Sequence, residues 1–174
     1  MKKTKVIAFL SLLVAMDVLL TRILSFQIDI IRVSFGFVPQ VFSSMLFGPL
    51  IGGAGAVLGD IIGMAVAPKG VYFPGFTFSA LLTGMIYGFF LFGKPKTLLR
   101  ITLAVLCITL FVDIGLNTYW LTILLGKGYM GMLPARIIKS AVMLPVQVSV
   151  ISLLWRYAGN HIENTLLNRV KENW

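Results

Sequence analysis

The chain has 174 residues, of which 58% are hydrophobic and only 12% are charged, whereas roughly 25% of an ordinary soluble domain is charged. Its mean hydropathy of +0.95 excludes a water-soluble globular protein and a disordered chain. A single cysteine excludes an intrachain disulfide framework. A membrane span takes about 20 residues, so a chain of this length accommodates several helices in one domain. The composition predicts a small polytopic membrane protein.

The net charge of +9 would suggest a nucleic-acid partner in a soluble protein. Here the cations are scattered along a hydrophobic chain and form no dense basic stretch. In membrane proteins an excess of Lys and Arg marks the cytoplasmic loops, so we expect no nucleic-acid partner. Cys107 lies inside an apolar run, and His161 has no second His or Cys near it, so the sequence predicts no metal site.

The hydropathy pattern predicts six membrane helices. The first follows a lysine-rich N-terminus and is longer than the apolar stretch of a signal peptide. The apolar stretch 33–67 is too long for one span, and Gly48-Pro49 predicts a break within it, because proline lacks a backbone donor and disfavours helix at the preceding residue. The expected spans are residues 6–26, 37–47, 50–66, 74–92, 100–125 and 133–157.

The loop cations predict the orientation. One side of the membrane would carry Lys2, Lys3, Lys5, Lys94, Lys96, Arg100, Arg156, Arg169 and Lys171. The opposite side would carry fewer cations: Lys69 and Lys127 in its loops, and Arg22, Arg32, Arg136 and Lys139 near helix ends. Because Lys and Arg accumulate on the cytoplasmic side, both termini are expected in the cytoplasm. We therefore expect an all-α integral membrane protein, with residues 1–174 forming one domain that is a bundle of six transmembrane helices.

Polar residues inside the expected spans indicate a ligand site. Ionisable groups in a bilayer cost roughly 2.5–3.5 kcal/mol each on insertion scales and commonly mark a pathway or a pocket. With a rise of about 1.5 Å per residue, Asp60 and Asn117 fall in the outer half of the membrane. Arg136 and Lys139 lie in the first turns of the sixth helix, and Arg32 precedes the second. Their convergence predicts a site that opens outward.

Two of these residues have a simpler interpretation, because Arg136 and Lys139 can also extend to the lipid headgroups. Asp60 and Asn117 lie too deep for that, which favours a role in ligand binding. The polar residues at the end of the first helix are interpreted as a local ion-pair and hydrogen-bond set: Asp17, Thr21 and Arg22.

The residue types suggest a ligand with an anionic tail and a flat polar ring. Arginine binds carboxylates in a bidentate manner, and a carboxylate or an amide pairs with the donor edge of an aminopyrimidine-type ring. Aromatic side chains can sandwich such a ring. The aromatic candidates are Phe35, Phe37, Tyr72, Phe73, Phe76, Tyr119 and Trp120.

Short motifs extend from the first helix to the middle of the sixth. They are residues 32–39 (Arg-Val-Ser-Phe-Gly-Phe-Val-Pro), 46–49 (Leu-Phe-Gly-Pro) and 59–60 (Gly-Asp), followed by 72–77 (Tyr-Phe-Pro-Gly-Phe-Thr), 79–84 (Ser-Ala-Leu-Leu-Thr-Gly), 116–120 (Leu-Asn-Thr-Tyr-Trp) and 133–139 (Leu-Pro-Ala-Arg-Ile-Ile-Lys). The first three resemble the substrate-binding S-component of energy-coupling-factor (ECF) vitamin transporters. The others resemble its folate-specific branch.

This resemblance implies a transport function rather than an enzyme. It implies high-affinity folate binding and uptake across the bacterial cell membrane, with folate as the transported ligand and no cofactor. The implied partners are membrane lipid, a transmembrane coupling subunit and two cytoplasmic ATPase subunits, since this chain contains no Walker motif. The implied substrate-binding residues are Arg32, Asp60, Tyr72, Phe76, Asn117, Trp120, Arg136 and Lys139.

The resemblance also implies a docking surface on the first helix. Members of the family often carry Ala-x-x-x-Ala there, where the coupling subunit binds. The nearest match in this chain is Ser11-x-x-x-Ala15, with Ala8 one turn earlier. Serine is small enough for close helix contact, so Ala8, Ser11 and Ala15 are the expected docking residues.

Other functions stay open at this point. They are an S-component for another vitamin, such as biotin, riboflavin or a pyrimidine, an integral-membrane enzyme, and a small channel or scaffold. No H-E-x-x-H motif, catalytic His or Cys with a neighbouring base supports an enzyme. Tight stoichiometric binding without turnover distinguishes a binding subunit from an enzyme or a channel, and a panel of vitamins identifies the ligand.

Overall fold

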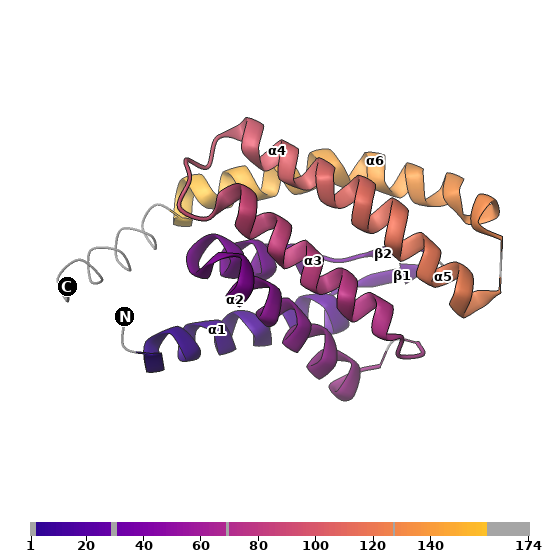
Figure 1. Cartoon of the computed structure of the whole chain (residues 1–174), viewed down its shortest axis with the longest axis horizontal. Helices are drawn as coiled ribbons and strands as arrows, with labels where there is room; N and C mark the ends of the chain where they lie inside the picture. The colour runs from indigo at the N-terminus through magenta and orange to yellow at the C-terminus, as the bar shows by residue number, and fades with distance from the viewer. Residues whose placement is uncertain (1–2, 29–30, 69, 127, 160–174) are drawn as a thin grey trace.

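The computed structural model describes residues 3–28, 31–68, 70–126 and 128–159. Within them the chain forms a bundle of long helices with one small hairpin (Figure 1). Five helical segments are long and apolar enough to cross a membrane: Val6–Ile23, Phe37–Val66, Pro74–Leu91, Leu98–Leu125 and Tyr129–Tyr157. The chain is therefore a helical membrane protein, as its composition predicts.

The first helix, α1 (Lys3–Val18), continues without a break into the π-helical segment η1 (Leu19–Ile23). It ends earlier than the sequence predicts, because the chain then forms strand β1 (Phe26–Ile28), which pairs antiparallel with β2 (Ile31–Val33). β-branched residues are frequent in this stretch and favour extended backbone. The hairpin is an addition to the all-α architecture expected from hydropathy, since an apolar strand and an apolar helix end have the same composition.

Helix α2 (Phe37–Val66) contains a non-helical residue, Gly48, with φ 88° and ψ 177°. This is the position where the sequence predicts a break. Glycine adopts positive φ at little cost, and the following Pro49 lacks the backbone donor that a continuous helix needs. The two halves of α2 therefore run in different directions from Gly48.

Helix α3 (Pro74–Leu91) packs closely against the second half of α2. A Cβ atom at Gly84 would lie 2.7 Å from the backbone oxygen of Gly52, and one at Gly88 would collide with Pro49. Only residues without a side chain allow two helix backbones to approach this closely. Helices α2 and α3 are thus held together backbone against backbone.

The second half of the chain forms two further long helices. Segments α4 (Leu98–Cys107), η2 (Ile108–Asn117) and α5 (Thr118–Leu125) follow one another without leaving helical backbone angles. Helix α6 (Tyr129–Leu154) continues into η3 (Trp155–Gly159) and begins about one turn earlier than the sequence predicts.

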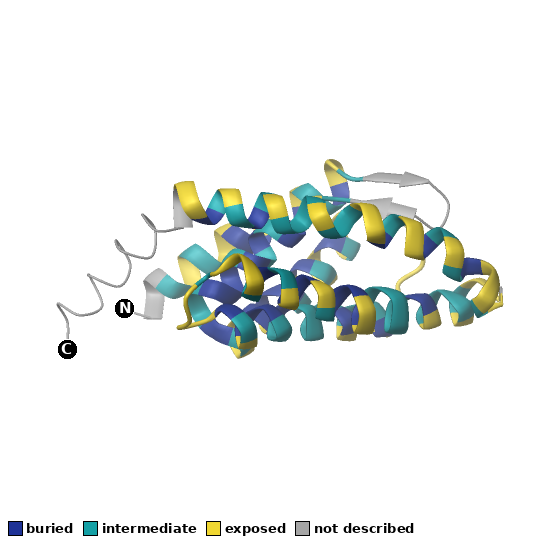
Figure 2. Cartoon of the chain, turned by 90° about the horizontal axis from the view of Figure 1, so that it is seen from above, coloured by how far each residue is buried: buried dark blue, intermediate teal, exposed yellow. Residues whose placement is uncertain are grey.

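The hydrophobic core lies between α2, α3, α4, η2 and the end of α6 (Figure 2). Large apolar side chains are also exposed along the outside of the bundle, as expected for a surface that faces lipid. The buried core residues are Phe37, Val41, Met45, Tyr87, Leu91, Ile101, Ala104, Val105, Ile108, Val112, Ile151 and Trp155. This core occupies the part of the bundle where α3 leads into α4, and it leaves the opposite end for polar groups.

Candidate functional site

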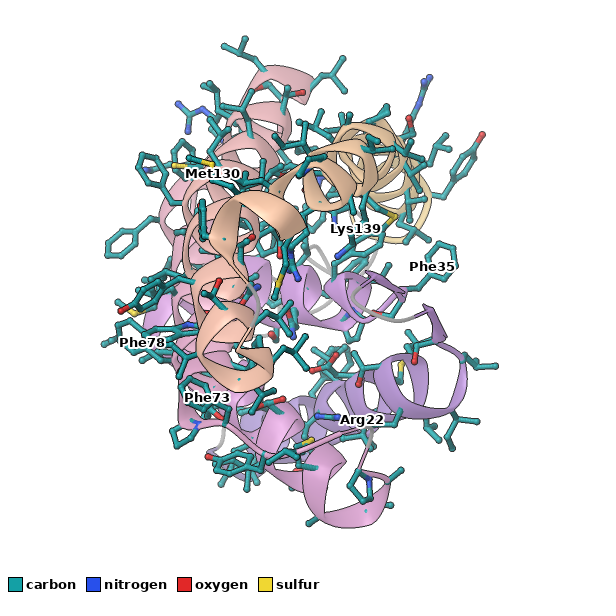
Figure 3. All side chains as sticks on the ribbon, turned by 90° about the vertical axis from the view of Figure 1, so that its right-hand side faces the viewer. Arg22, Phe35, Phe73, Phe78, Met130 and Lys139 are labelled. Carbon is teal, nitrogen blue, oxygen red and sulfur yellow. The ribbon has the colours of Figure 1, made fainter. Side chains whose placement is uncertain are left out.

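A cavity of about 550 Å³ opens at the end of the bundle where α3 begins and α5 ends. Its volume lies within the range of roughly 300–1,000 Å³ that small-molecule sites occupy. Figure 3 looks onto this end, with Arg22 and Lys139 pointing toward the middle from opposite sides and Phe78 and Met130 pointing outward. The lining residues are Thr21, Arg22, Ser34, Asp60, Met64, Gly70, Val71, Tyr72, Phe73, Phe76, Asp113, Asn117, Leu121, Leu124, Leu125, Arg136 and Lys139.

One wall of the cavity is built around Arg22, which is buried in η1. Its Nη2 donates to Asp60 Oδ1 over 3.0 Å and to the Asp60 backbone oxygen over 3.3 Å, and its Nη1 donates to Met64 Sδ over 3.0 Å. The side chain reaches α2 because Gly63 lies beneath it: a Cβ atom there would lie 2.6 Å from Arg22 Nε. A glycine on α2 therefore allows an arginine on η1 to cross between the helices.

Both carboxylate oxygens of Asp60 accept hydrogen bonds from neighbouring side chains. While Oδ1 accepts from Arg22, Oδ2 accepts from the Thr77 hydroxyl on α3 over 2.7 Å. The same hydroxyl lies 3.3 Å from the hydroxyl of Tyr72. Asp60 thus connects η1, α2 and α3, and it fixes the position of the Arg22 guanidinium.

The opposite wall is formed by η2 and α6. Asn117 Nδ2 donates to Asp113 Oδ1 over 3.1 Å, and Arg136 is buried on α6 with Lys139 one turn further along. Asn117 Oδ1 is buried without a hydrogen-bond partner within the described part of the chain. A buried carbonyl oxygen without a donor is costly, and a ligand that donated a hydrogen bond to this atom would remove that cost.

The two walls differ in charge. On the first wall Arg22 is balanced by Asp60 in an ion pair. The second wall carries Arg136 and Lys139 together with Asp113. Two of the three described cations that line the cavity therefore lie on α6, the side to which a carboxylate ligand is attracted.

Aromatic residues near the start of α3 cover part of the cavity. Tyr72, Phe73 and Phe76 line it. Trp120 lies behind Phe73, with ring centroids 5.6 Å apart, and its Nε1 donates to Ser79 Oγ over 3.2 Å. Trp120 therefore supports the aromatic lining from outside and is not itself part of the lining that the structure describes.

The structure brings most of the expected binding residues together. Those that line the cavity are Asp60, Tyr72, Phe76, Asn117, Arg136 and Lys139. Trp120 lies one layer behind, as described above. The backbone of Arg32 pairs with that of Gln27 in the hairpin, but its side chain lies outside the described part of the structure.

Sequence reasoning assigned Arg22 to a local set with Asp17 and Thr21, and this assignment is wrong. The Thr21 hydroxyl does donate to the Asp17 backbone oxygen over 2.7 Å, but Arg22 pairs across the bundle with Asp60. The sequence offers one signal for this pairing: Arg22 and Asp60 are oppositely charged residues in two different expected spans. Asp113 also lines the cavity, but it is not among the binding residues expected from the sequence. Its position four residues before Asn117, on the same face of the helix, is the signal that could have identified it.

The expected docking residues lie on α1. Ala8, Ser11 and Ala15 are all exposed in the isolated chain, and their spacing of three, four and seven residues places them on one face of a helix. Among the described residues, no group of three or more His, Cys, Asp or Glu is arranged to hold a metal ion.

Comparison with known proteins agrees with the motifs. The family model "ECF transporter, substrate-specific component" matches residues 5–156. The chain is 42% identical to a folate transporter, FolT, of Clostridium novyi over 156 residues, covering 90% of this chain and 91% of that protein. It is 31% identical to a FolT of Leuconostoc mesenteroides subsp. mesenteroides over 153 residues, covering 84% and 82%.

A solved structure is also similar. The crystal structure of FolT bound with folic acid matches with a TM-score of 0.83 and 36% identity, covering 87% of this chain and 92% of that one. The relatives are named as transporters and not as enzymes. The resemblance seen in the sequence motifs is confirmed, and the chain belongs to the family of substrate-specific components of ECF transporters.

Proposed function

We propose that this chain binds folate in the cavity between η1 and α6 and serves as the substrate-binding subunit of an ATP-driven vitamin importer in a bacterial cell membrane. The two relatives named above are folate transporters, and the similar solved structure contains folic acid. The observation that carries the proposal is the combination of cations on α6 with aromatic side chains at the start of α3 in the lining of one cavity. Folate has two carboxylates at one end and a flat, hydrogen-bonding pterin at the other, so the lining offers suitable groups to both ends.

The glutamate carboxylates of folate pair with Arg136 and Lys139. Both cations line the cavity on α6, whereas Arg22 on the other wall forms an ion pair with Asp60. Pairing a buried arginine with a carboxylate gives short, charge-assisted hydrogen bonds. Arg32, which precedes α2 in the sequence, is a further candidate for this end of the ligand.

The pterin ring lies against the aromatic side chains at the start of α3. Tyr72, Phe73 and Phe76 offer flat apolar surface, and Trp120 holds Phe73 from behind. Asn117 Oδ1, which has no partner among the described residues, accepts a hydrogen bond from the ring.

Asp60 acts mainly through Arg22 in this arrangement. Both of its oxygens already accept hydrogen bonds from the protein, one from Arg22 and one from Thr77. Its role is therefore to hold the guanidinium and the hydroxyl at fixed positions on the cavity wall. That Asp60 also binds the donor edge of the pterin stays a prediction, because each carboxylate oxygen can accept a second hydrogen bond.

Transport requires partner subunits, because this chain carries no ATP-binding motif. The face of α1 formed by Ala8, Ser11 and Ala15 is exposed in the isolated chain, and small residues let another helix approach closely. We propose this face as the docking surface for the transmembrane coupling subunit, which in turn binds two cytoplasmic ATPases.

The membrane topology completes the proposal. If the two parts of α2 on either side of Gly48 each cross the bilayer, the chain has six spans and both termini lie on the same side. The loop cations place that side in the cytoplasm. The cavity, at the opposite end of the bundle, then opens to the outside.

Calorimetric titration of the purified chain in detergent tests the proposed ligand. Folate is expected to bind at one molecule per chain without being altered, while biotin and riboflavin at the same concentrations give no heat. Binding of either of these vitamins in preference to folate would assign the chain to another branch of the family.

A further inference from the structure

The end of the bundle opposite the cavity carries basic side chains around Trp155. We name Lys94, Lys96, Arg100 and Arg156 the basic end cluster. The first three belong to the turn between α3 and α4 and to the first turn of α4, and Arg156 follows Trp155 in η3. Figure 1 shows this turn beside the C-terminal end of α6. Segments that are far apart in the sequence thus bring four cations to one end of the molecule.

Trp155 holds the two parts of this cluster together. Lys96 Nζ lies 4.7 Å from the centroid of its ring, within the range of a cation–π interaction. The indole is itself buried and packs against Phe42, with ring centroids 6.3 Å apart. The cluster is therefore built on a side chain of the hydrophobic core, and its geometry does not depend on exposed lysines alone.

Within the part of the chain that the structure describes, Lys94, Arg100 and Arg156 form no ion pair with a carboxylate. The described acidic residues are Asp17, Asp60 and Asp113, and the last two belong to the cavity at the other end. Lys94 Nζ donates to the backbone oxygen of Phe89 over 2.7 Å, which leaves its positive charge in place. The cluster thus presents a positive field to any anion at this end.

The surface beside the cluster is apolar. Phe92, Leu98, Leu99 and Tyr157 are all exposed, the last to 80%. A soluble anion or an acidic peptide would bind the cations and leave these apolar side chains exposed. A phospholipid contacts the cations and the apolar side chains together, because its phosphate lies at the level of the cations and its acyl chains lie along the neighbouring apolar surface.

We propose that the basic end cluster binds the headgroup of an anionic phospholipid. Lys94, Arg100 and Arg156 contact the headgroup phosphate, Trp155 and Lys96 form the floor, and the acyl chains cover Leu98 and Leu99. The site is separate from the cavity and does not depend on which vitamin the cavity holds. Its effect is to fix the depth of this end of the bundle in a membrane that contains anionic lipid.

Native mass spectrometry of the full chain in neutral detergent tests this site. Phosphatidylglycerol is expected to bind at least tenfold more tightly than phosphatidylcholine. The triple variant Lys94→Gln/Arg100→Gln/Arg156→Gln is expected to lose at least tenfold in affinity for phosphatidylglycerol. A matched control, Lys2→Gln/Lys3→Gln/Lys5→Gln, removes the same charge from the N-terminus and is expected to change this affinity less than twofold.

Equal binding of the two lipids overturns the proposal, and so does an equal loss in the control variant, which would indicate diffuse electrostatic attraction. Displacement of the lipid by millimolar glycerol phosphate would instead assign the cluster to a soluble anion. Folate titration of each variant shows whether it is folded, and Arg156→Gln alone replaces the triple variant if that protein does not fold. If neither the parent nor any variant binds folate, the proposed vitamin is wrong, and thermal unfolding followed by tryptophan fluorescence shows instead whether each variant is folded, so that the lipid result can still be judged.

Discussion

The guanidinium of Arg22 and the carboxylate of Asp60 form a 3.0 Å ion pair between two helices, although 38 residues separate them in the sequence. The arginine side chain is only 4% exposed and that of the aspartate 21%. The pair is thus largely removed from water, where the loss of one partner leaves a charge that nothing nearby compensates. It is a structural element of the cavity wall as well as a part of its lining.

Replacing Asp60 by alanine is expected to destabilise the protein strongly. Removal of one partner of a buried ion pair costs roughly 3–5 kcal/mol, whereas Thr77→Val removes one hydrogen bond to the same carboxylate, worth about 1 kcal/mol. Thermal unfolding in detergent, followed by tryptophan fluorescence, measures both variants. Equal melting temperatures for Asp60→Ala and Thr77→Val would show that the ion pair does not contribute as argued.

Arg136→Ala and Lys139→Ala are expected to weaken folate binding roughly ten- to a hundredfold, since a hydrogen bond to a charged group is worth about 1.5–3 kcal/mol. Pteroic acid lacks the glutamate and should lose little affinity in the same variants. Calorimetric titration of both ligands gives the comparison. An equal loss for folate and pteroic acid would mean that these cations do not bind the glutamate carboxylates.

Asn117→Ala is expected to weaken folate and pteroic acid to the same extent, because its carbonyl oxygen is proposed to accept from the ring that both ligands share. A single hydrogen bond of this kind corresponds to roughly a tenfold change in the dissociation constant. Leu124→Ala, on the same cavity lining but without a polar group, is the matched control. Unchanged binding in Asn117→Ala would remove this residue from the site.

Bulky side chains on the proposed docking face are expected to stop transport without affecting ligand binding. Ser11→Trp and Ala15→Trp would hold a partner helix away from α1, while the cavity lies at the other end of the bundle. Uptake of labelled folate by cells and titration of the purified variants measure the two properties. Met16→Trp, an exposed position on another face of α1, should transport normally, and impaired uptake in that control would point to a general effect on α1.

The topology is tested by cysteine labelling in a Cys107→Ser background. A cysteine at position 94 is expected to resist a membrane-impermeant thiol reagent in intact cells, and one at position 69 is expected to react, because the lysine-rich loops stay in the cytoplasm. The reverse pattern would place the cavity on the cytoplasmic side and contradict uptake from outside.

The long helices and much of the cavity could be predicted from the sequence because the signals are local. Hydropathy marks the spans, Gly48-Pro49 marks the change of direction in α2, and the rarity of polar residues inside the spans singles out Asp60 and Asn117. The hairpin after η1 could not be predicted in the same way. Its residues are as apolar as a helix end, and only the pairing of β1 with β2 distinguishes the two structures.

Contacts between segments that are far apart in the chain could also not be predicted from the sequence. That Arg22 reaches Asp60 depends on how α1 and η1 cross α2, and on the absence of a side chain at Gly63. Trp120 lies three residues after Asn117 on the same helix, a spacing at which two side chains share one face. The structure places only Asn117 of the two in the cavity lining, because the ring of Trp120 packs against Phe73 and its Nε1 donates to Ser79.

The close packing of α2 against α3 at Gly84 and Gly88 has a mechanical consequence. The backbones of the two helices are in direct contact at these positions, which opposes movement of one helix against the other. The cavity lies between these two helices and the pair formed by η2 and α6. The shared hydrophobic core joins the two walls at the other end of the bundle, so a ligand that contacts both walls adds a second connection at the cavity end. We therefore expect the bound ligand to reduce movement of the two walls relative to each other.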